Sequence, residues 1–131
     1  MNGVVWYVDT SAFLKLVVDE TSSRAMRDWS LVHDGLWSSH LLRTEALRAA
    51  QRLEISSQTI EEALETIALV LPSVGTYASA GRLQPKGLRS LDALHVASAL
   101  ELGTDLEGMV VYDQRMSAAA QELSIAVVAP T

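Results

Sequence analysis

Short apolar runs alternate with longer amphipathic stretches along the chain. The runs are rich in β-branched and aromatic residues, which favours strands at residues 3–8, 36–38, 109–112 and 125–128. The first run, GVVWYV, shows no polar alternation and therefore suits a strand buried on both faces, as in a parallel sheet. Apolar residues at helical spacing predict helices at residues 10–18, 22–33, 39–53, 57–70, 91–103 and 114–123. This alternation predicts one α/β domain over residues 1–131, with a central parallel sheet flanked by helices.

The region around residues 70–86 is ambiguous. Pro72 is expected to end the helix over residues 57–70. Residues 73–81 fit either a short strand or the start of a helix, and Gln84-Pro85-Lys86-Gly87 predicts a loop. Ser90 is expected to cap the helix that follows, and Gly103 to close it. The role of residues 70–86 stays open at this point.

Composition narrows the class of protein. Of the 131 residues, 49% are hydrophobic, which is ample for a compact core. There is no cysteine, which excludes disulfides, zinc–thiolate sites and thiol nucleophiles. The net charge of −6 argues against broad, non-specific binding to nucleic acid. No signal-peptide pattern and no apolar segment of membrane-spanning length is found, so we expect a cytoplasmic protein without membrane contact.

Two aspartates stand where ligands bind in parallel sheets. Asp9 follows directly on the strand predicted at residues 3–8, and Asp113 follows the strand predicted at residues 109–112. The carboxyl ends of neighbouring parallel strands meet at one edge of the sheet, where loops and helix N-termini converge. If the two strands are neighbours, both carboxylates face the same crevice.

Two further acids lie on apolar faces of helices. Glu45 shares its face with Leu42 and Ala49, and Asp92 shares its face with Val96. An ionised carboxylate on such a face is costly unless it is paired or coordinates a metal ion. These positions therefore favour a common site with the two aspartates.

Other interpretations of each acid remain open. Asp9 and Asp113 can cap their own helices, Asp92 can complement a helix dipole, and Glu45 can pair with an arginine. Together, however, crowded carboxylates repel one another unless a cation lies between them. With no cysteine, and with no histidines in a metal-ligand spacing, oxygen ligands predominate and favour Mg²⁺ or Mn²⁺ over zinc. Such ions activate water and neutralise phosphate charge, as in nucleases and phosphatases.

Four blocks of sequence resemble the PIN-domain ribonucleases. The blocks are YVDTSAFLKL, RTEALRA, LRSLDALHVASAL and VVYDQRMSAAAQELSI, and they occur in the family's order nearly end to end. Within the family, the likeness is to the VapC-like toxin of type II (VapBC) toxin–antitoxin pairs. The resemblance implies a Mg²⁺- or Mn²⁺-dependent endoribonuclease, a hydrolase whose catalytic residues are Asp9, Glu45, Asp92 and Asp113. It further implies that Asp9, Asp92 and Asp113 bind the metal, while Glu45 ligates it or orients a water, and that Ser11 supports Asp9.

Basic residues near these acids are candidates for binding the RNA. Arg82, Lys86 and Arg89 cluster just before the Asp92 helix, and Arg115 follows Asp113. Because guanidinium groups suit phosphate, Arg89 and Arg115 are the candidates for substrate binding, although ordinary surface solubility explains them equally well. His95, three residues after Asp92, is within reach of a hydrogen bond to it, but we interpret it as a structural histidine outside the catalytic set.

The resemblance also implies partners. These are a small cognate antitoxin (VapB-like) that blocks the site, a second copy in a homodimer, and promoter DNA only through the antitoxin complex. Apolar segments at residues 12–18, 29–36 and 41–53 are candidates for the surfaces that bind these partners.

Two other functions remain open. The chain can be a non-catalytic, metal-stabilised module that binds RNA or a partner, or a haloacid-dehalogenase-like phosphatase. The phosphatase requires a second aspartate two residues after the first, where this chain has Ser11. A phosphoacceptor receiver domain requires an acid pair near the N-terminus and a late lysine, and neither is evident.

Overall fold

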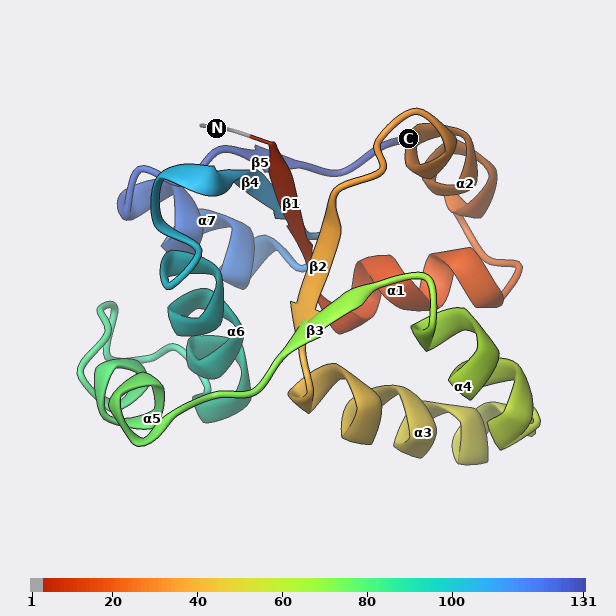
Figure 1. Cartoon of the computed structure of the whole chain (residues 1–131), viewed down its shortest axis with the longest axis horizontal. Coiled ribbons are helices and arrows are strands. Elements are labelled where there is room, and N and C mark those ends of the chain that lie inside the picture. The colour runs from red at the N-terminus through yellow and green to blue at the C-terminus, as the bar shows by residue number, and fades with distance from the viewer. Residues whose placement is uncertain (1–3) are drawn as a thin grey trace.

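The computed structural model describes residues 4–131 and contains one sheet of five parallel strands. The strands stand in the order β3-β2-β1-β4-β5, with β1 in the centre (Figure 1). Their bounds are β1 Val5–Val8, β2 Leu36–Ser39, β3 Ala68–Val70, β4 Leu106–Val110 and β5 Val127–Val128. The helices are α1 Thr10–Val17, α2 Ser23–Leu31, α3 Leu41–Leu53, α4 Ser57–Leu64, α5 Val74–Gly81, α6 Ser90–Leu100 and α7 Gln114–Glu122. The predicted α/β class with a parallel sheet is confirmed.

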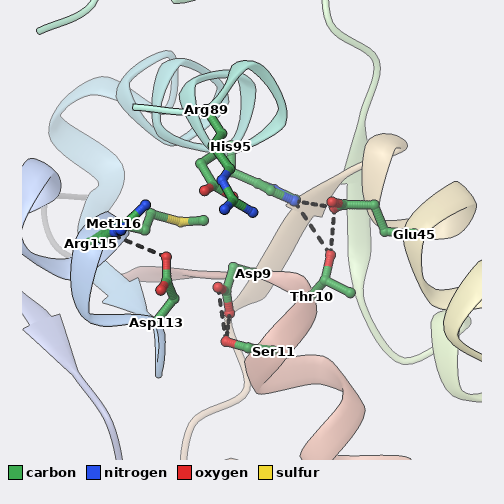
Figure 2. Close-up of a pocket in the computed structure, with 10 residues that line it drawn as sticks. Asp9, Thr10, Ser11, Glu45, Arg89, His95, Asp113, Arg115 and Met116 are labelled. Atoms are coloured by element: carbon green, nitrogen blue, oxygen red, sulfur yellow. Dashed lines mark hydrogen bonds and ion pairs between the residues drawn. The ribbon is translucent and has the colours of Figure 1, made fainter. Parts of the chain in front are cut away.

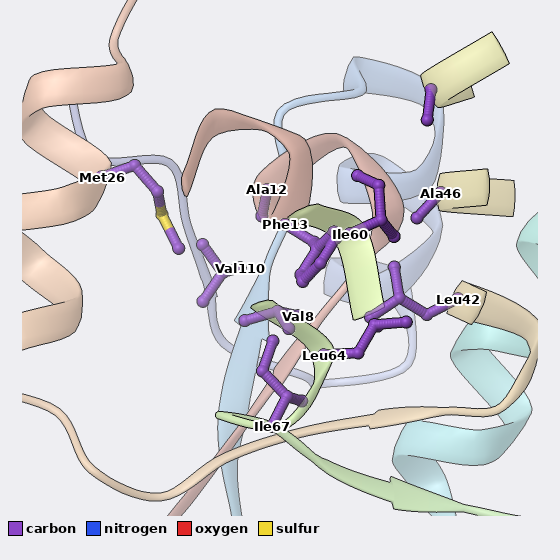
Figure 3. Packing of buried hydrophobic residues seen from close by; sticks show 11 residues of the cluster. Val8, Ala12, Phe13, Met26, Leu42, Ala46, Ile60, Leu64, Ile67 and Val110 are labelled. Atoms are coloured by element: carbon purple, nitrogen blue, oxygen red, sulfur yellow. The ribbon is translucent and has the colours of Figure 1, made fainter. Parts of the chain in front are cut away.

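The helices cover the two faces of the sheet. Helices α1 to α4 pack on one face and α5 to α7 on the other, so alternate residues of β1 serve different cores (Figure 1). Val8 points to the first core, where Phe13, Leu42 and Ile60 are fully buried (Figure 3). Tyr7 points to the second core, with Val96, Met109 and Met116. Burial on both faces explains why β1 reads as a continuous apolar run.

The predicted helix over residues 57–70 is wrong at its C-terminal end. Helix α4 ends at Leu64, and residues 68–70 instead form β3, which pairs with β2 from Trp37↔Ala68 to Ser39↔Val70. The free edge of β2 provides backbone partners that the local sequence does not reveal. The ambiguous residues 73–81 form helix α5, and Ser73 and Thr76 close a capping box at its start.

Other boundaries also differ from the prediction. Strand β5 begins at Val127 rather than at residue 125, and residue 3, where the first strand was expected to begin, lies outside the described residues. Strand β4 spans Leu106–Val110 rather than residues 109–112, because its pairing with β1 begins at Val5↔Leu106. Arg89, and not Ser90, is the N-cap of α6, and Gly103 begins a 3₁₀ turn with a φ of +60° instead of closing the helix. No helix within residues 4–131 has the length and apolar character that crossing a membrane requires.

Gly108 allows a close approach between neighbouring strands. It pairs with Trp6 of β1, and a Cβ atom added there would lie 2.5 Å from the carbonyl oxygen of Ala126 and 2.7 Å from the Trp6 ring. The position therefore accepts no side chain, so glycine permits β4 to pair closely with both neighbours.

Candidate active site

The parallel pairing of β1 and β4 brings two loops together at one edge of the sheet. Val8 is opposite Val110, so Asp9 directly after β1 and Asp113 three residues after β4 lie close in space. There they line a pocket of about 390 Å³, which helices α3 and α6 complete (Figure 2). Its lining residues are Asp9, Thr10, Ser11, Glu45, Arg89, Asp92, His95, Asp113, Arg115 and Met116. The structure thus brings together all four predicted acids, Ser11 and both predicted arginines.

Asp9 is the most buried of the four acids, with 2% of its surface exposed. Its Oδ1 accepts the backbone N–H of Ala12 at 2.9 Å, which caps helix α1. The Ser11 hydroxyl donates to both carboxylate oxygens, at 2.7 and 2.9 Å, and also accepts the backbone N–H of Tyr112 at 3.3 Å. Burial raises the pKa of Asp9 to about 6 despite these hydrogen bonds. Asp9 is therefore both the cap of α1 and a buried carboxyl group with a raised pKa.

Glu45 points from helix α3 into the pocket with 23% of its side chain exposed. Its Oε1 accepts the Thr10 hydroxyl at 2.6 Å and lies 2.6 Å from Nε2 of His95 (Figure 2). Burial acts to raise the pKa of Glu45, but the hydrogen bonds from His95 and Thr10 outweigh it and lower the pKa. Among the described residues no hydrogen bond engages the other oxygen, Oε2, which is left for a water or an ion.

His95, interpreted from the sequence as a structural histidine outside the catalytic set, lines this pocket. The ring is 1% exposed, with Nδ1 2.8 Å from the Tyr7 hydroxyl and Nε2 2.6 Å from Glu45. The hydrogen bond between His95 and Asp92 that the sequence allowed is not formed; the ring contacts Tyr7 and Glu45 instead. The spacing of Asp92 and His95 put both on one side of α6, and that was the available signal. This spacing did not identify the hydrogen-bond partner of His95, which is Glu45 on helix α3.

Asp92 and Asp113 complete the acidic lining. Asp92 lies half-buried in the first turn of α6. Its pKa is raised by burial first and by the negative charge of Asp113 second. Asp113 is exposed and caps α7, with Oδ2 accepting the backbone N–H of Met116 at 3.2 Å. The like charges of these two carboxylates favour a cation between them.

The donor set fits a hydrated Mg²⁺ or Mn²⁺ ion. As placed, no three acidic or histidine side chains within residues 4–131 converge closely enough to enclose an ion by themselves. Mg²⁺, however, usually keeps several waters and takes only one or two carboxylates from the protein. The pocket has room for such waters, and its carboxyl groups Asp9 and Asp92 have pKa values raised by burial. Hard oxygen donors around an open space suit these ions better than zinc.

Comparison with known protein families gives a match over most of the chain. The PIN domain family matches residues 6–122. Ribonuclease VapC46 of Mycobacterium tuberculosis is 39% identical over 126 residues, covering 95% of this chain and 97% of the relative. Ribonuclease VapC47 of the same organism is 31% identical over 133 residues, covering 95% and 96%.

Solved structures agree in fold. The crystal structure of Mycobacterium tuberculosis VapC20, described as a sarcin-ricin loop cleaving toxin, superposes with a TM-score of 0.76 at 16% identity, covering 95% of this chain and 99% of that one. A toxin–antitoxin complex from Klebsiella pneumoniae gives a TM-score of 0.74 at 17% identity, covering 95% and 97%. With the sheet order, the acidic pocket and the sequence match in agreement, this chain belongs to the PIN-domain family and, within it, groups with the VapC ribonucleases.

Proposed function

We propose that the protein is a Mg²⁺- or Mn²⁺-dependent endoribonuclease that acts as the toxin of a toxin–antitoxin pair, arresting translation or growth by hydrolysing RNA. The observation that carries this proposal is the pocket at the edge of the sheet, where four carboxylates from four separate segments face two arginines. The relatives named as ribonucleases, at 31–39% identity over nearly the whole chain, support the same activity.

The proposed chemistry assigns a task to each acid. Asp9, Asp92 and Asp113 would hold the metal, which when bound supplies an activated water and neutralises charge on the phosphate. Glu45, with its lowered pKa, stays ionised and uses its Oε2 to accept a hydrogen bond from the attacking water. Ser11 holds the Asp9 carboxylate in place through two hydrogen bonds.

The two arginines provide the positive charge that an acidic site needs in order to bind RNA. Arg89 precedes α6 and Arg115 lies in the first turn of α7, and both are exposed at the pocket. Neither forms an ion pair with an acid of residues 4–131. Their forked N–H donors are therefore available to bind phosphate oxygens beside the acids.

The partners follow from the same proposal. A small VapB-like antitoxin would block the site, the toxin would form a homodimer, and promoter DNA would be bound only through the antitoxin complex. A structural neighbour described as a toxin–antitoxin complex supports the antitoxin. Leu31 is 83% exposed and, with Leu16 and Leu36, borders an apolar hollow of about 570 Å³, a surface suited to an apolar partner segment. Replacing Leu16 with lysine should weaken antitoxin binding in a pull-down, and unchanged binding would count against this surface.

A second candidate is a binding module that holds RNA or a partner without cutting it. It is favoured by the separation of the acids, since no three converge on one point within the described residues. Such a protein would retain RNA binding but would show no metal-dependent cleavage.

Cleavage of RNA by protein freed of its antitoxin distinguishes the two. We expect the wild type to cut a structured RNA in Mg²⁺ or Mn²⁺, and EDTA or Asp9→Asn to abolish the cutting. Asp28→Asn is the matched control, because Asp28 is an exposed acid on α2 away from the pocket. Undiminished cleavage by Asp9→Asn would refute the site assignment, whereas RNA binding without any cleavage would favour the binding module.

A further inference from the structure

A second hollow lies against the start of helix α6, on the helix face next to the one that lines the acidic pocket. It has a volume of about 500 Å³ and is formed by α5, the loop 82–88 and α6, and we refer to it as the α5–α6 groove. Asp92 of α6 lines the pocket, whereas Ala93 and Leu94 line the groove. We propose that the α5–α6 groove binds a nucleotide next to the cleaved bond of a single-stranded RNA, an inference that rests on the proposed ribonuclease function.

The charge of the groove is opposite to that of the chain. The protein has 16 acidic and 10 basic residues, yet no acidic residue lines the groove, while Arg82 and Lys86 do. Both side chains are exposed, and neither forms an ion pair with an acid of the described residues. Two unpaired cations on an acidic protein favour a ligand with phosphate groups over a neutral or a basic partner.

The floor and rim of the groove suit a nucleobase. The floor is apolar and includes the half-buried side chains of Leu83, Leu88 and Leu94. Tyr77 lines the groove and is 56% exposed, so its ring can be reached by a base bound there. Proteins bind single strands without strict sequence preference by stacking bases on aromatic rings and placing cations along the backbone. The groove has both features.

The groove and the pocket share the segment at the start of α6. Leu88 and Ser90 line the groove, and Arg89 between them lines the pocket. An RNA strand whose phosphate is bound by Arg89 would reach the groove by passing over the start of α6. This arrangement gives residues 74–88 a task that their sequence alone did not suggest, since they would fix the strand while the acids act on the bond.

Binding of a short, fluorescein-labelled single-stranded RNA tests the groove. The measurement uses fluorescence anisotropy at several salt concentrations, in the Asp9→Asn protein with Mg²⁺ so that the RNA stays intact. We expect Tyr77→Ala to weaken binding about tenfold, and Tyr77→Phe to restore it, because stacking needs only the ring. The Tyr77 variants should leave the salt dependence unchanged.

Removal of the two cations should change the salt dependence instead. Each phosphate contact with a single strand contributes about 0.7 to the slope of log affinity against log salt, so Arg82→Ser with Lys86→Ser should lower the slope by roughly 1 to 1.5. The matched control is Arg24→Ser with Arg52→Ser, which removes two exposed charges from α2 and α3. Equal effects of both double variants would show an influence of net charge only and would overturn the proposal.

Cleavage assays separate a failure of the groove from a failure of the enzyme. If the active protein cuts RNA and the groove variants cut and bind like the wild type, the groove is wrong and the ribonuclease function stands. If a peptide from the antitoxin, rather than RNA, responds to Tyr77→Ala, the groove belongs to a protein partner and the proposal is overturned. If the wild type neither binds nor cuts any RNA, both proposals fall together.

Discussion

The hydroxyl group of Tyr7 lies 2.8 Å from Nδ1 of His95, and both side chains are fully buried. When the phenol donates this hydrogen bond, the imidazole carries its proton on Nε2, the atom that lies 2.6 Å from the Oε1 of Glu45. Tyr7 in the central strand β1 thereby fixes the hydrogen bond from His95 that positions the carboxylate of Glu45 on α3. Burial raises the pKa of Tyr7 to about 12, so the phenol remains a donor throughout the physiological range.

Removing this hydrogen bond should slow the reaction without unfolding the protein. Because one net hydrogen bond amounts to about 1 kcal/mol, Tyr7→Phe should lower kcat roughly fivefold, and His95→Leu should lower it more. In a Glu45→Gln background neither change should lower kcat further, which a double-mutant cycle measures. Ser23→Ala is the control, because it removes two part-buried hydrogen bonds at the start of α2 and should reduce stability but leave kcat unchanged. Additive losses in the cycle would contradict a positioning role for His95.

Asp9→Asn should stabilise the metal-free protein at neutral pH. The folded pKa of about 6 lies above the ordinary value of 3.8, so the folded state holds the proton more tightly than the unfolded state. The stability that protonated Asp9 contributes is full below about pH 4 and is lost as the pH rises to about 6, a change of roughly 3 kcal/mol. Asparagine keeps the cap but not the charge, so we expect a gain on the order of 1–3 kcal/mol at pH 7.5 that vanishes at pH 4. Urea unfolding in EDTA measures this difference, and a gain independent of pH would contradict it.

Addition of Mg²⁺ or Mn²⁺ should make the wild type more stable than the Asp9→Asn variant. An ion that binds only the folded state at a concentration of 100 times its Kd adds about 2.7 kcal/mol of stability. The wild type and the Asp28→Asn control should gain this stability, whereas Asp9→Asn and Asp92→Asn should gain little. Thermal denaturation with and without the ion measures the effect, and equal gains in all four proteins would place the ion outside the pocket.

The pocket arginines should act mainly on substrate binding. Loss of a hydrogen bond between charged groups amounts to about 1.5–3 kcal/mol, so Arg89→Ala or Arg115→Ala should lower kcat/KM roughly 10- to 100-fold. The loss should appear mostly in KM, because these side chains bind phosphate before and during the reaction. Arg24→Ala, on α2, should leave both constants unchanged. An unaltered KM in the pocket variants would leave these arginines with a role in solubility only.

Gly108→Ala tests the packing of the sheet. The added Cβ would meet a backbone oxygen of Ala126 at 2.5 Å, and backbone yields less readily than a side chain. We expect a loss of about 2–4 kcal/mol in the free energy of unfolding, measured with urea. Gly81→Ala is the control, since an added Cβ there has no neighbour within 4 Å.

The sequence predicted those parts of the fold that depend on local pattern. The central strand β1 follows from a continuous apolar run, and the helices that carry Glu45 and Asp92 follow from their periodicity. The order of the strands was not available from any one segment. Strand β3 was mistaken for helix, because Ile67 and Leu69 fit both patterns and only the edge of β2 decides between them.

The candidate site was predictable where an acidic residue directly follows a strand or lies on an apolar face of a helix. The four acids, Ser11 and the two arginines were predicted from position and resemblance, and all line one pocket. The hydrogen bonds between Tyr7, His95 and Glu45 were not, because they join residues 50 and 88 positions apart. Contacts of that kind arise from tertiary packing, and a single sequence carries no direct signal for them.

The central place of β1 has a consequence for synthesis on the ribosome. Asp9 emerges early, but its strand obtains its second neighbour only when β4 has been made, and Asp113 follows β4. A growing chain that has exposed Asp9, Glu45 and even Asp92 still lacks one wall of the pocket. The four acids can therefore gather only after β4 and the segment that carries Asp113 have been made, so a fragment that stops before Asp113 cannot form the complete pocket.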